Sequence, residues 1–242
     1  PPRAPRRWPD PELAAHREAV RKAITPRPAR RLGPFQVVST LRQIFPRNTL
    51  ATVDTGSHRI LINHVWEAYE PRRLLQSNGL GSMGYGLPAA VGVQMAHPDA
   101  LVIDIAGEAS ILMNMQEMST ALQYRLPVKI FILNNEYMGM VRQWQQLLHG
   151  GRYSHSYSEA LPDFVKMAEA YGCVGIRASK PEELDAKIME MIAVKRPVLF
   201  DCRVDPHENC YPMIPSGAAH DEMILSDSED EPEVSEEGKM MV

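Results

Sequence analysis

Oxygen-bearing side chains follow two apolar segments of the chain at the points where those segments end. Glu108 comes shortly after the apolar run 100–105, and Asn135 follows the apolar run 128–133. A carboxylate and an amide oxygen are ligands that Mg²⁺ accepts, and Mg²⁺ usually keeps phosphate oxygens in its coordination shell. The backbone carbonyl of Tyr137 can complete the protein's share of ligands. The spacing therefore predicts a site where one hard cation holds a diphosphate.

Small residues surround Glu108. Gly107, Ala109 and Ser110 leave the backbone open, so that its N–H groups can approach a phosphate closely. A helix that begins here would add a favourable dipole for an anion. A structural interpretation stays open at this point, because a pair of asparagines is also typical of a turn that ends a strand.

A glycine-rich loop offers a competing interpretation. Gly79, Gly81 and Gly84 match the G-x-G-x-x-G pattern of dinucleotide-binding folds, and Asp104 lies twenty residues after Gly84. This pattern favours an NAD-binding oxidoreductase of the Rossmann type, with Asp104 at the end of the next strand. We rank it second, because it leaves the two asparagines without a role and the strand before Gly79 is weakly marked. The glycines can also be close-packing positions of an ordinary core.

The elements that must position these residues alternate along the chain. Helices are predicted at 11–24, 34–45, 87–96, 114–124, 138–148, 162–171 and 181–194, and strands at 49–54, 72–76, 100–105, 128–133, 174–178 and 197–204. The strands are continuously apolar, which indicates burial on both faces and hence a parallel sheet covered by helices. We predict an α/β fold of three layers, α/β/α, with a mostly parallel six-stranded sheet. Ligands of such sheets bind beyond the carboxyl ends of the strands, where the candidate residues stand.

Size and composition are those of a globular protein. The 242 residues suffice for one large α/β domain, with 44% hydrophobic and 23% charged residues. No apolar run approaches the ~20 residues of a membrane span, and residues 1–10 lack the apolar core of a secretory signal. Cys173, Cys202 and Cys210 have neither zinc-like nor redox spacing, which favours reduced thiols in a cytoplasmic protein.

Charge is concentrated at the two ends, although the net charge is only −4. Residues 1–31 carry nine Lys and Arg against three acids, whereas 221–237 carry nine acids and no Lys or Arg. Solvated flanks are the simplest interpretation, with a loosely ordered tail after Pro215. Prolines interrupt the basic stretch and only Trp8 could stack on a base, so we expect neither a nucleic acid nor a membrane as a partner.

Longer strings around these residues resemble a known family. Gly107-Glu108-Ala109, then 24 residues, then Asn134-Asn135 is similar to the thiamin diphosphate motif. The strings 78–90 (NGLGSMGYGLPAA), 138–145 (MGMVRQWQ) and 212–217 (PMIPSG) resemble the large catalytic subunit of acetolactate synthase, also called acetohydroxyacid synthase. The resemblance runs from residue 34 to 217 and implies the thiamin-diphosphate-binding fold.

The resemblance implies a role for each matching position. Glu108, Asn135 and the Tyr137 carbonyl would bind Mg²⁺, and Trp144 would stand in the substrate channel and favour a larger second 2-keto acid. Residues that would line thiamin diphosphate are Gly56, His58, Gly81, Met83, Gly107, Ala109, Ser110, Gly139 and Met140. Taken singly, the histidine, methionine and tryptophan positions would be packing residues, and the flanking strings favour the functional interpretation.

Two positions depart from the family pattern. Glu108 stands where the family usually has Asp, and its extra methylene moves the carboxylate by about 1.5 Å. Related thiamin-dependent keto-acid dehydrogenases use Glu there, so we keep Glu108 as a ligand. Residues 55–60 (TGSHRI) replace a Gly-Gln-His-Gln-Met-Trp segment. This replacement leaves a sister thiamin-dependent carboligase or decarboxylase as an alternative.

The resemblance covers only the last domain of a longer enzyme. We expect a linker with an N-terminal helix at 1–33, the diphosphate-binding domain at 34–217 and an acidic tail at 218–242. The glutamate that activates the aminopyrimidine would lie in a preceding domain, so no catalytic residue is expected on this chain. Alone, the chain should bind the cofactor poorly and catalyse little. A fragment of one enzyme and a stand-alone interaction partner of a separately encoded domain both remain open.

For the complete enzyme, the resemblance implies condensation of pyruvate with a second 2-keto acid and loss of CO₂, in branched-chain amino acid biosynthesis. Its cofactors would be thiamin diphosphate and Mg²⁺, with FAD in a non-redox role bound mostly by a middle domain. A homodimer or homotetramer would form through the active-site interface, and a regulatory small subunit would be a further partner.

Overall fold

The computed structural model describes residues 10–25 and 32–227, and these fall into two compact units. The larger unit contains the described residues from 32 to 210 and carries the whole sheet. The smaller unit contains 10–25 and 211–227. Much of the predicted linker and the acidic end of the tail lie outside the described residues, so the predicted domain limits stay predictions.

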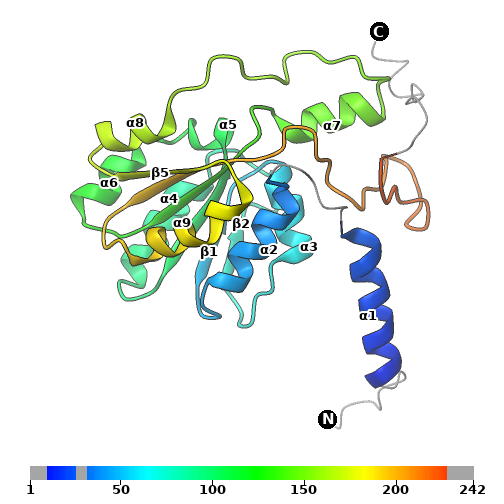
Figure 1. Ribbon diagram of the computed structural model, residues 1–242, viewed down its shortest axis with the longest axis horizontal. Helices are drawn as coiled ribbons and strands as arrows, with labels where there is room; N and C mark the ends of the chain where they lie inside the picture. Colours follow the sequence, from blue (N-terminus) through cyan, green and yellow to red (C-terminus); the bar gives the residue numbers. More distant parts are fainter. Residues whose placement is uncertain (1–9, 26–31, 228–242) are drawn as a thin grey trace. The chain divides into compact units, whose positions relative to one another are not determined.

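Six strands form one sheet in the order β2-β1-β3-β4-β6-β5, and every neighbouring pair is parallel (Figure 1). The strands are β1 (Leu50–Val53), β2 (Leu74–Gln76), β3 (Val102–Gly107), β4 (Lys129–Asn134), β5 (Val174–Ala178) and β6 (Val198–Arg203). All six predicted strands are present, and the predicted fold class is confirmed. The chain steps from β1 outward to β2 and then returns to β3 on the other side of β1.

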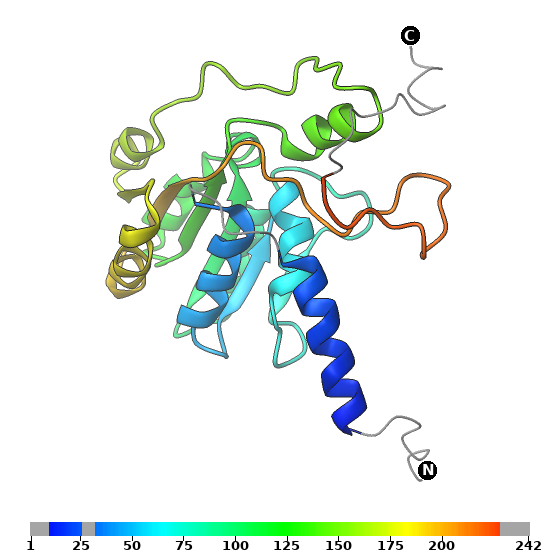
Figure 2. The same cartoon turned by 45° about the vertical axis from the view of Figure 1, so that its right-hand side comes forward.

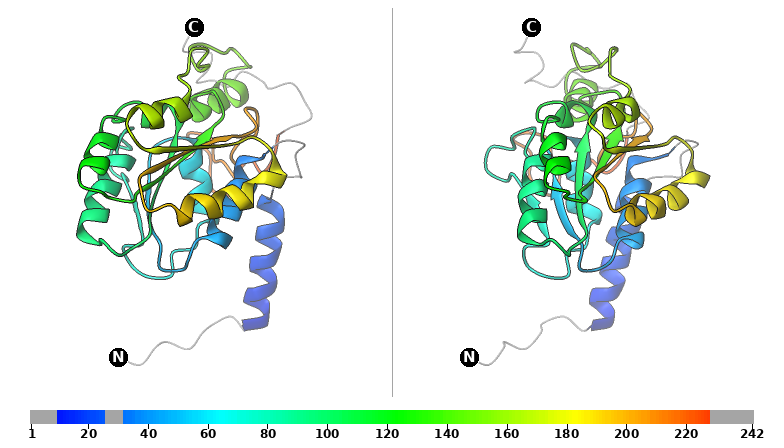
Figure 3. Two further views of the ribbon diagram at one scale, coloured as in Figure 1. Left: turned by 60° about the vertical axis from the view of Figure 1, so that its left-hand side comes forward. Right: turned by 90° about the vertical axis from the view of Figure 1, so that its left-hand side faces the viewer.

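Helices cover both faces of the sheet, which makes three layers. The helices are α1 (Asp10–Ile24), α2 (Pro34–Ile44), α3 (Ser57–Val65), α4 (Gly86–Ala96), α5 (Glu108–Ile111), α6 (Glu117–Gln123), α7 (Gly139–Leu147), α8 (Phe164–Ala170) and α9 (Pro181–Ala193). Helices α2, α3 and α9 pack on one face, where α2 and α3 lie side by side (Figure 2). Helices α4, α6 and α8 pack on the other. Figure 3 shows the yellow α9 and the green α6 on opposite sides of the sheet.

The central strands are buried on both faces, as their apolar sequences predict. In β3, Ile103 belongs to the core beneath α2 and α3, whereas its neighbour Val102 belongs to the core beneath α4 and α6. Phe131 of β4 stacks on Phe200 of β6, with ring centroids 4.7 Å apart. Because both faces are covered, the ends of the strands are the places where polar side chains can reach a ligand.

All seven predicted helices are present, with ends shifted by up to three residues. Two further helices were not predicted. Helix α3 contains apolar residues that suit a strand equally well, and the burial of Leu61 and Ile62 against the sheet decides for the helix. Helix α5 is a single turn that begins at Glu108, directly after β3.

The smaller unit is described on its own. Helix α1 has acidic residues in its first turn and basic residues in its last, which complements the helix dipole. Met213 and Ile224 form an antiparallel bridge, so part of the tail predicted to be loosely ordered has a defined backbone. No helix in the described parts of the chain is long and apolar enough to span a bilayer. All three cysteines are buried free thiols of the larger unit.

Candidate cofactor site

A cavity of about 240 Å³ lies at the carboxyl ends of β1, β3 and β4. Its wall comes from the stretches 55–60, 107–110 and 137–141, together with Met83, Leu133 and Asn135. The chain places β2 on one side of β1 and β3 on the other, so the direction in which strands are added changes between β1 and β3. Open parallel sheets bind ligands at such a switch point. The cavity therefore lies where the fold class places a ligand.

Eleven of the thirteen predicted site residues line this cavity: Gly56, His58, Met83, Gly107, Glu108, Ala109, Ser110, Asn135, Tyr137, Gly139 and Met140. The other two, Gly81 and Trp144, are not part of its wall. Gly81 has a φ of +61° in the glycine-rich loop, and Trp144 is 38% exposed on α7. The structure thus brings the residues of both strand ends together, and the role of each residue stays a prediction.

Glu108 is a buried carboxyl group with an unpartnered oxygen. The residue begins α5 and is 1% exposed, and its Oε1 has no hydrogen-bond partner among the described residues. Burial, and to a smaller extent the charges of Asp201 and Glu136, raise the pKa of Glu108 to about 7. A cation beside Oε1 would supply the missing partner and compensate the buried charge.

Asn135 lies close to the first residue of α7. Its Oδ1 accepts a hydrogen bond from the Tyr137 N–H at 3.3 Å. A Cβ at Gly139 would lie 2.9 Å from Asn135 Nδ2 and 2.6 Å from Ser57 Oγ. Glycine at 139 lets α7 begin this near to the residues after β1 without displacing the side chains of Ser57 and Asn135, and all three residues line the cavity.

The oxygen donors of the cavity fit a magnesium–phosphate group. Glu108, Asn135 and Tyr137 all line the cavity, and they would offer a carboxylate, an amide oxygen and a backbone carbonyl. Among the described residues there is no group of three or more His, Cys, Asp or Glu side chains suited to a metal. A cation here would therefore depend on this mixed set and on the oxygens of its ligand, which is the usual situation of Mg²⁺.

His58 is buried in the cavity wall as a neutral ring. Its Nε2 lies 3.0 Å from the Asp54 carbonyl, and because a carbonyl can only accept, Nε2 carries the proton. Burial lowers the pKa of His58 to about 4. The neutral ring offers only a lone pair at Nδ1, so it cannot donate to a phosphate without taking up a second proton. The contact of His58 with a diphosphate stays a prediction, and it requires Nδ1 to be protonated.

Asp54 holds the glycine-rich loop and was missed in the sequence. Its carboxylate accepts hydrogen bonds from the Gly84 N–H at 2.9 Å and the Gly86 N–H at 3.0 Å. The dinucleotide interpretation requires Asp104 at the end of a strand, and the structure does not place it there. It lies in the middle of β3, fully buried, and accepts a hydrogen bond from Thr52 Oγ1 at 3.1 Å. The loop is therefore anchored to the sheet, and Asp104 cannot reach a ribose.

Arg59 is a second residue of the site that no sequence motif had indicated. It is the only Lys or Arg among the residues that line the cavity, and its Nη2 donates to Asn78 Oδ1 at 2.9 Å. A guanidinium here would favour an anionic ligand. The signal in the sequence is its position in 55–60, immediately after the candidate His58.

Taken together, the parallel sheet and the cavity beyond the carboxyl ends of β1, β3 and β4 define an α/β domain with a ligand site at the edge of its sheet. A family model described as "Thiamine pyrophosphate enzyme, C-terminal TPP binding domain" matches residues 54–202. The chain belongs to this family of thiamine pyrophosphate (thiamin diphosphate) enzymes. Family membership excludes the NAD-binding alternative.

Curated relatives are acetolactate synthases. The chain is 46% identical over 202 residues to the acetolactate synthase isozyme 3 large subunit of Escherichia coli. The matched segment covers 82% of this chain and 35% of that protein. It is 44% identical over 201 residues to the large subunit of Haemophilus influenzae, covering 83% and 35%. It is 44% identical over 212 residues to the mitochondrial catalytic subunit of Saccharomyces cerevisiae, covering 86% and 31%. The chain thus spans about a third of the length of these relatives.

Proposed function

We propose that this domain holds the diphosphate of thiamin diphosphate through Mg²⁺, as part of an acetolactate synthase-type enzyme. The observation that carries the proposal is the unpartnered Oε1 of buried Glu108 in the wall that it shares with Asn135 and Tyr137. A buried carboxylate oxygen without a partner is unfavourable unless a ligand supplies one. Magnesium is the cation whose preference for oxygen ligands and phosphate matches this wall.

The chain's own residues would bind and orient the cofactor. Glu108, Asn135 and the Tyr137 carbonyl would take the metal, while backbone N–H groups of 109–110 and 139–140 would face the diphosphate. Met83 and Gly81 would lie toward the pyrimidine. When bound, thiamin diphosphate supplies the electron sink that permits loss of CO₂ from a 2-keto acid and joining of the remainder to a second one.

Activity, substrates and partners concern the whole protein, and the names of the relatives support them. The reaction would condense pyruvate with a second 2-keto acid, and Trp144 would face that second substrate. The activating glutamate would come from another domain. We also propose FAD as a second cofactor, a homodimer or homotetramer, a regulatory small subunit and a cytoplasmic location. The segment 55–60, with Arg59 in the cavity wall, favours a sister thiamin-dependent carboligase as the second candidate.

Glu108→Gln in the full-length protein tests the metal site. Titration calorimetry with thiamin diphosphate and Mg²⁺ should give a loss of metal-dependent affinity of roughly tenfold or more, equivalent to ~1.4 kcal/mol. The cofactor-free variant should be at least as stable as the wild type, because the amide removes a carboxyl group whose ionisation is unfavourable in this buried position. The two measurements therefore move in different directions.

Glu169→Gln is the matched control. Glu169 is exposed on α8 and does not line the cavity, and the substitution makes the same chemical change. It should leave both affinity and stability unchanged. If Glu108→Gln binds the cofactor with wild-type affinity, Glu108 is not a metal ligand and the proposal loses its main support.

A further inference from the structure

The loop that carries two of the proposed metal ligands has an unfavourable backbone conformation at its centre. Glu136 stands between Asn135 and Tyr137 with a φ of +63°, in the left-handed region that non-glycine residues rarely adopt. Its carbonyl accepts a hydrogen bond from the Ser158 N–H at 2.9 Å. A residue in this conformation persists only where its surroundings hold it.

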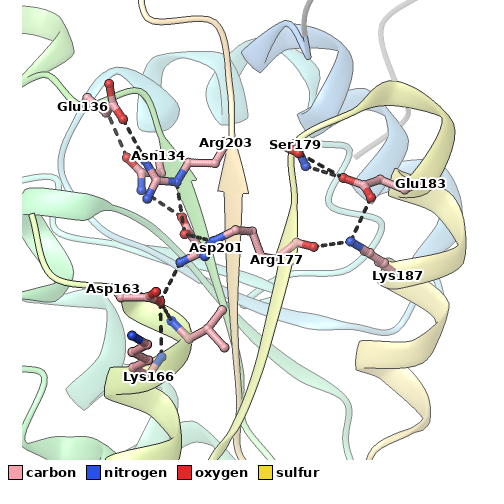
Figure 4. Close-up of polar contacts among 11 residues, drawn as sticks. Asn134, Glu136, Asp163, Lys166, Arg177, Ser179, Glu183, Lys187, Asp201 and Arg203 are labelled. Carbon is pink, nitrogen blue, oxygen red and sulfur yellow. Dashed lines mark hydrogen bonds and ion pairs between the residues drawn. The ribbon is translucent and has the colours of Figure 1, made fainter.

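A fully buried carboxylate lies behind this loop. Asp201 of β6 is 0% exposed and accepts hydrogen bonds from three side chains (Figure 4). The donors are Asn134 Nδ2 at 2.8 Å, Arg203 Nε at 3.2 Å and Arg177 Nε at 2.9 Å. Two guanidinium groups and an amide satisfy the carboxylate, so its position is strongly determined.

Two of these donors continue to Glu136. Arg203 Nη1 donates to Glu136 Oε1 at 2.7 Å, and the Glu136 N–H donates to Asn134 Oδ1 at 3.3 Å (Figure 4). Glu136 is therefore held at its side chain through Arg203 and at its backbone through Asn134. Both contacts trace back to Asp201. The third donor, Arg177, leads away from the loop to Asp163 Oδ1 at 2.6 Å.

We propose that Asp201 is a positioning residue for the metal site. Through Arg203 and Asn134 it keeps Glu136 in the left-handed conformation. That conformation sets the direction in which the chain leaves Glu136, and so brings Tyr137, whose carbonyl is a proposed ligand, into the wall that contains Glu108. The inference rests on the proposed function, since it assigns Asp201 a role toward the cation.

Of the side chains that hold Glu136 in place, Arg203 can be shortened with the least damage to packing. It borders an open cavity of about 430 Å³, and its side chain is 33% exposed, so a shorter residue leaves no sealed void. Arg177 borders the same cavity at 37% exposure and donates to the same carboxylate oxygen, but does not contact Glu136. The two arginines therefore form a matched pair.

The test compares Arg203→Gln with Arg177→Gln in the full-length protein. Binding of Mn²⁺, followed by electron paramagnetic resonance in the presence of thiamin diphosphate, should weaken about tenfold in Arg203→Gln, as for other groups that orient metal ligands. In Arg177→Gln it should change less than about twofold, although both variants lose an ion pair to Asp201. A merely structural role would affect both alike.

Glu136→Gly supplies a second arm, because glycine adopts a positive φ without help. In the Glu136→Gly background, Arg203→Gln should change Mn²⁺ affinity less than about twofold, since there is no longer a carboxylate to hold. Arg203→Lys, which keeps a cation near Glu136, should recover part of the affinity in the wild-type background.

Amide hydrogen exchange of metal-free protein separates this inference from the proposed function. Exchange of residues 136–138 should accelerate in Arg203→Gln and stay unchanged in Arg177→Gln, whether or not the protein binds thiamin diphosphate. If the wild type binds no Mn²⁺, the proposed function fails and exchange alone decides whether Asp201 holds the loop. Unchanged exchange in Arg203→Gln, or equal losses of affinity in the two arginine variants, would overturn the inference.

Discussion

Gly86 is the position where one added methyl group should be most damaging. It is the first residue of α4, and a Cβ there would lie 2.2 Å from Asp104 Oδ1 and 3.1 Å from Asp54 Cβ. Both aspartates are at least 99% buried, so neither can turn toward solvent to make room. Gly86→Ala must therefore shift the start of α4 or displace Asp104 within the core.

The expected cost follows from the contacts that would be lost. Overpacking a buried site typically costs about 1–3 kcal/mol. Displacing Asp104 also weakens the hydrogen bond from Thr52, and moving α4 weakens the one from the Gly86 N–H to Asp54, each worth roughly 1 kcal/mol. We expect a loss of about 3 kcal/mol, which for a domain of this size lowers Tm by roughly 6–12 °C.

Gly92 in the same helix provides the control. A Cβ at Gly92 would meet nothing within 4 Å, so Gly92→Ala should gain about 0.5–1 kcal/mol from helix propensity and raise Tm slightly. Scanning calorimetry of both variants measures the contrast. Adding Asp104→Ala to Gly86→Ala removes Oδ1, the atom that clashes with the new Cβ, and should recover part of the lost stability. A neutral Gly86→Ala, or shifts of the same sign in both variants, would refute the packing argument.

Two further substitutions test the cavity wall. His58 has a folded pKa of about 4 against 6.5 ordinarily, so the unfolded chain binds more protons between these values. The stability that the neutral ring contributes above pH 6.5 is lost as pH falls. Between pH 7 and 4.5, the free energy of unfolding of His58→Asn, measured with urea, should therefore fall by about 2–3 kcal/mol less than that of the wild type. Equal losses in the two proteins would contradict a buried neutral ring. Gly139→Ala would drive a Cβ against Ser57 and Asn135 and should lower Mn²⁺ affinity roughly tenfold; wild-type binding there would show that the Asn135 side chain is not a ligand.

The sequence by itself determined the sheet and the meeting of its two strand tips. Apolar runs that are hydrophobic on both faces can be satisfied only by a covered parallel sheet. In such a sheet consecutive strands with a helical crossover commonly become neighbours, and β3 pairs with β4 in the register Gly107 to Leu133. Glu108 and Asn135 therefore lie at one edge, and their residue types were sufficient to predict an oxygen-lined cation site.

Only the tertiary structure decided what supports that site. Asp54 under the glycine-rich loop and Asp201 behind Glu136 act through partners that are distant in the sequence, such as Gly86 and Asn134. No local pattern marks such contacts, because an isolated aspartate in an apolar strand looks the same whether it is an anchor or a ligand. Burial and long-range hydrogen bonding separate the two, and both arise only when the strands are assembled into a sheet.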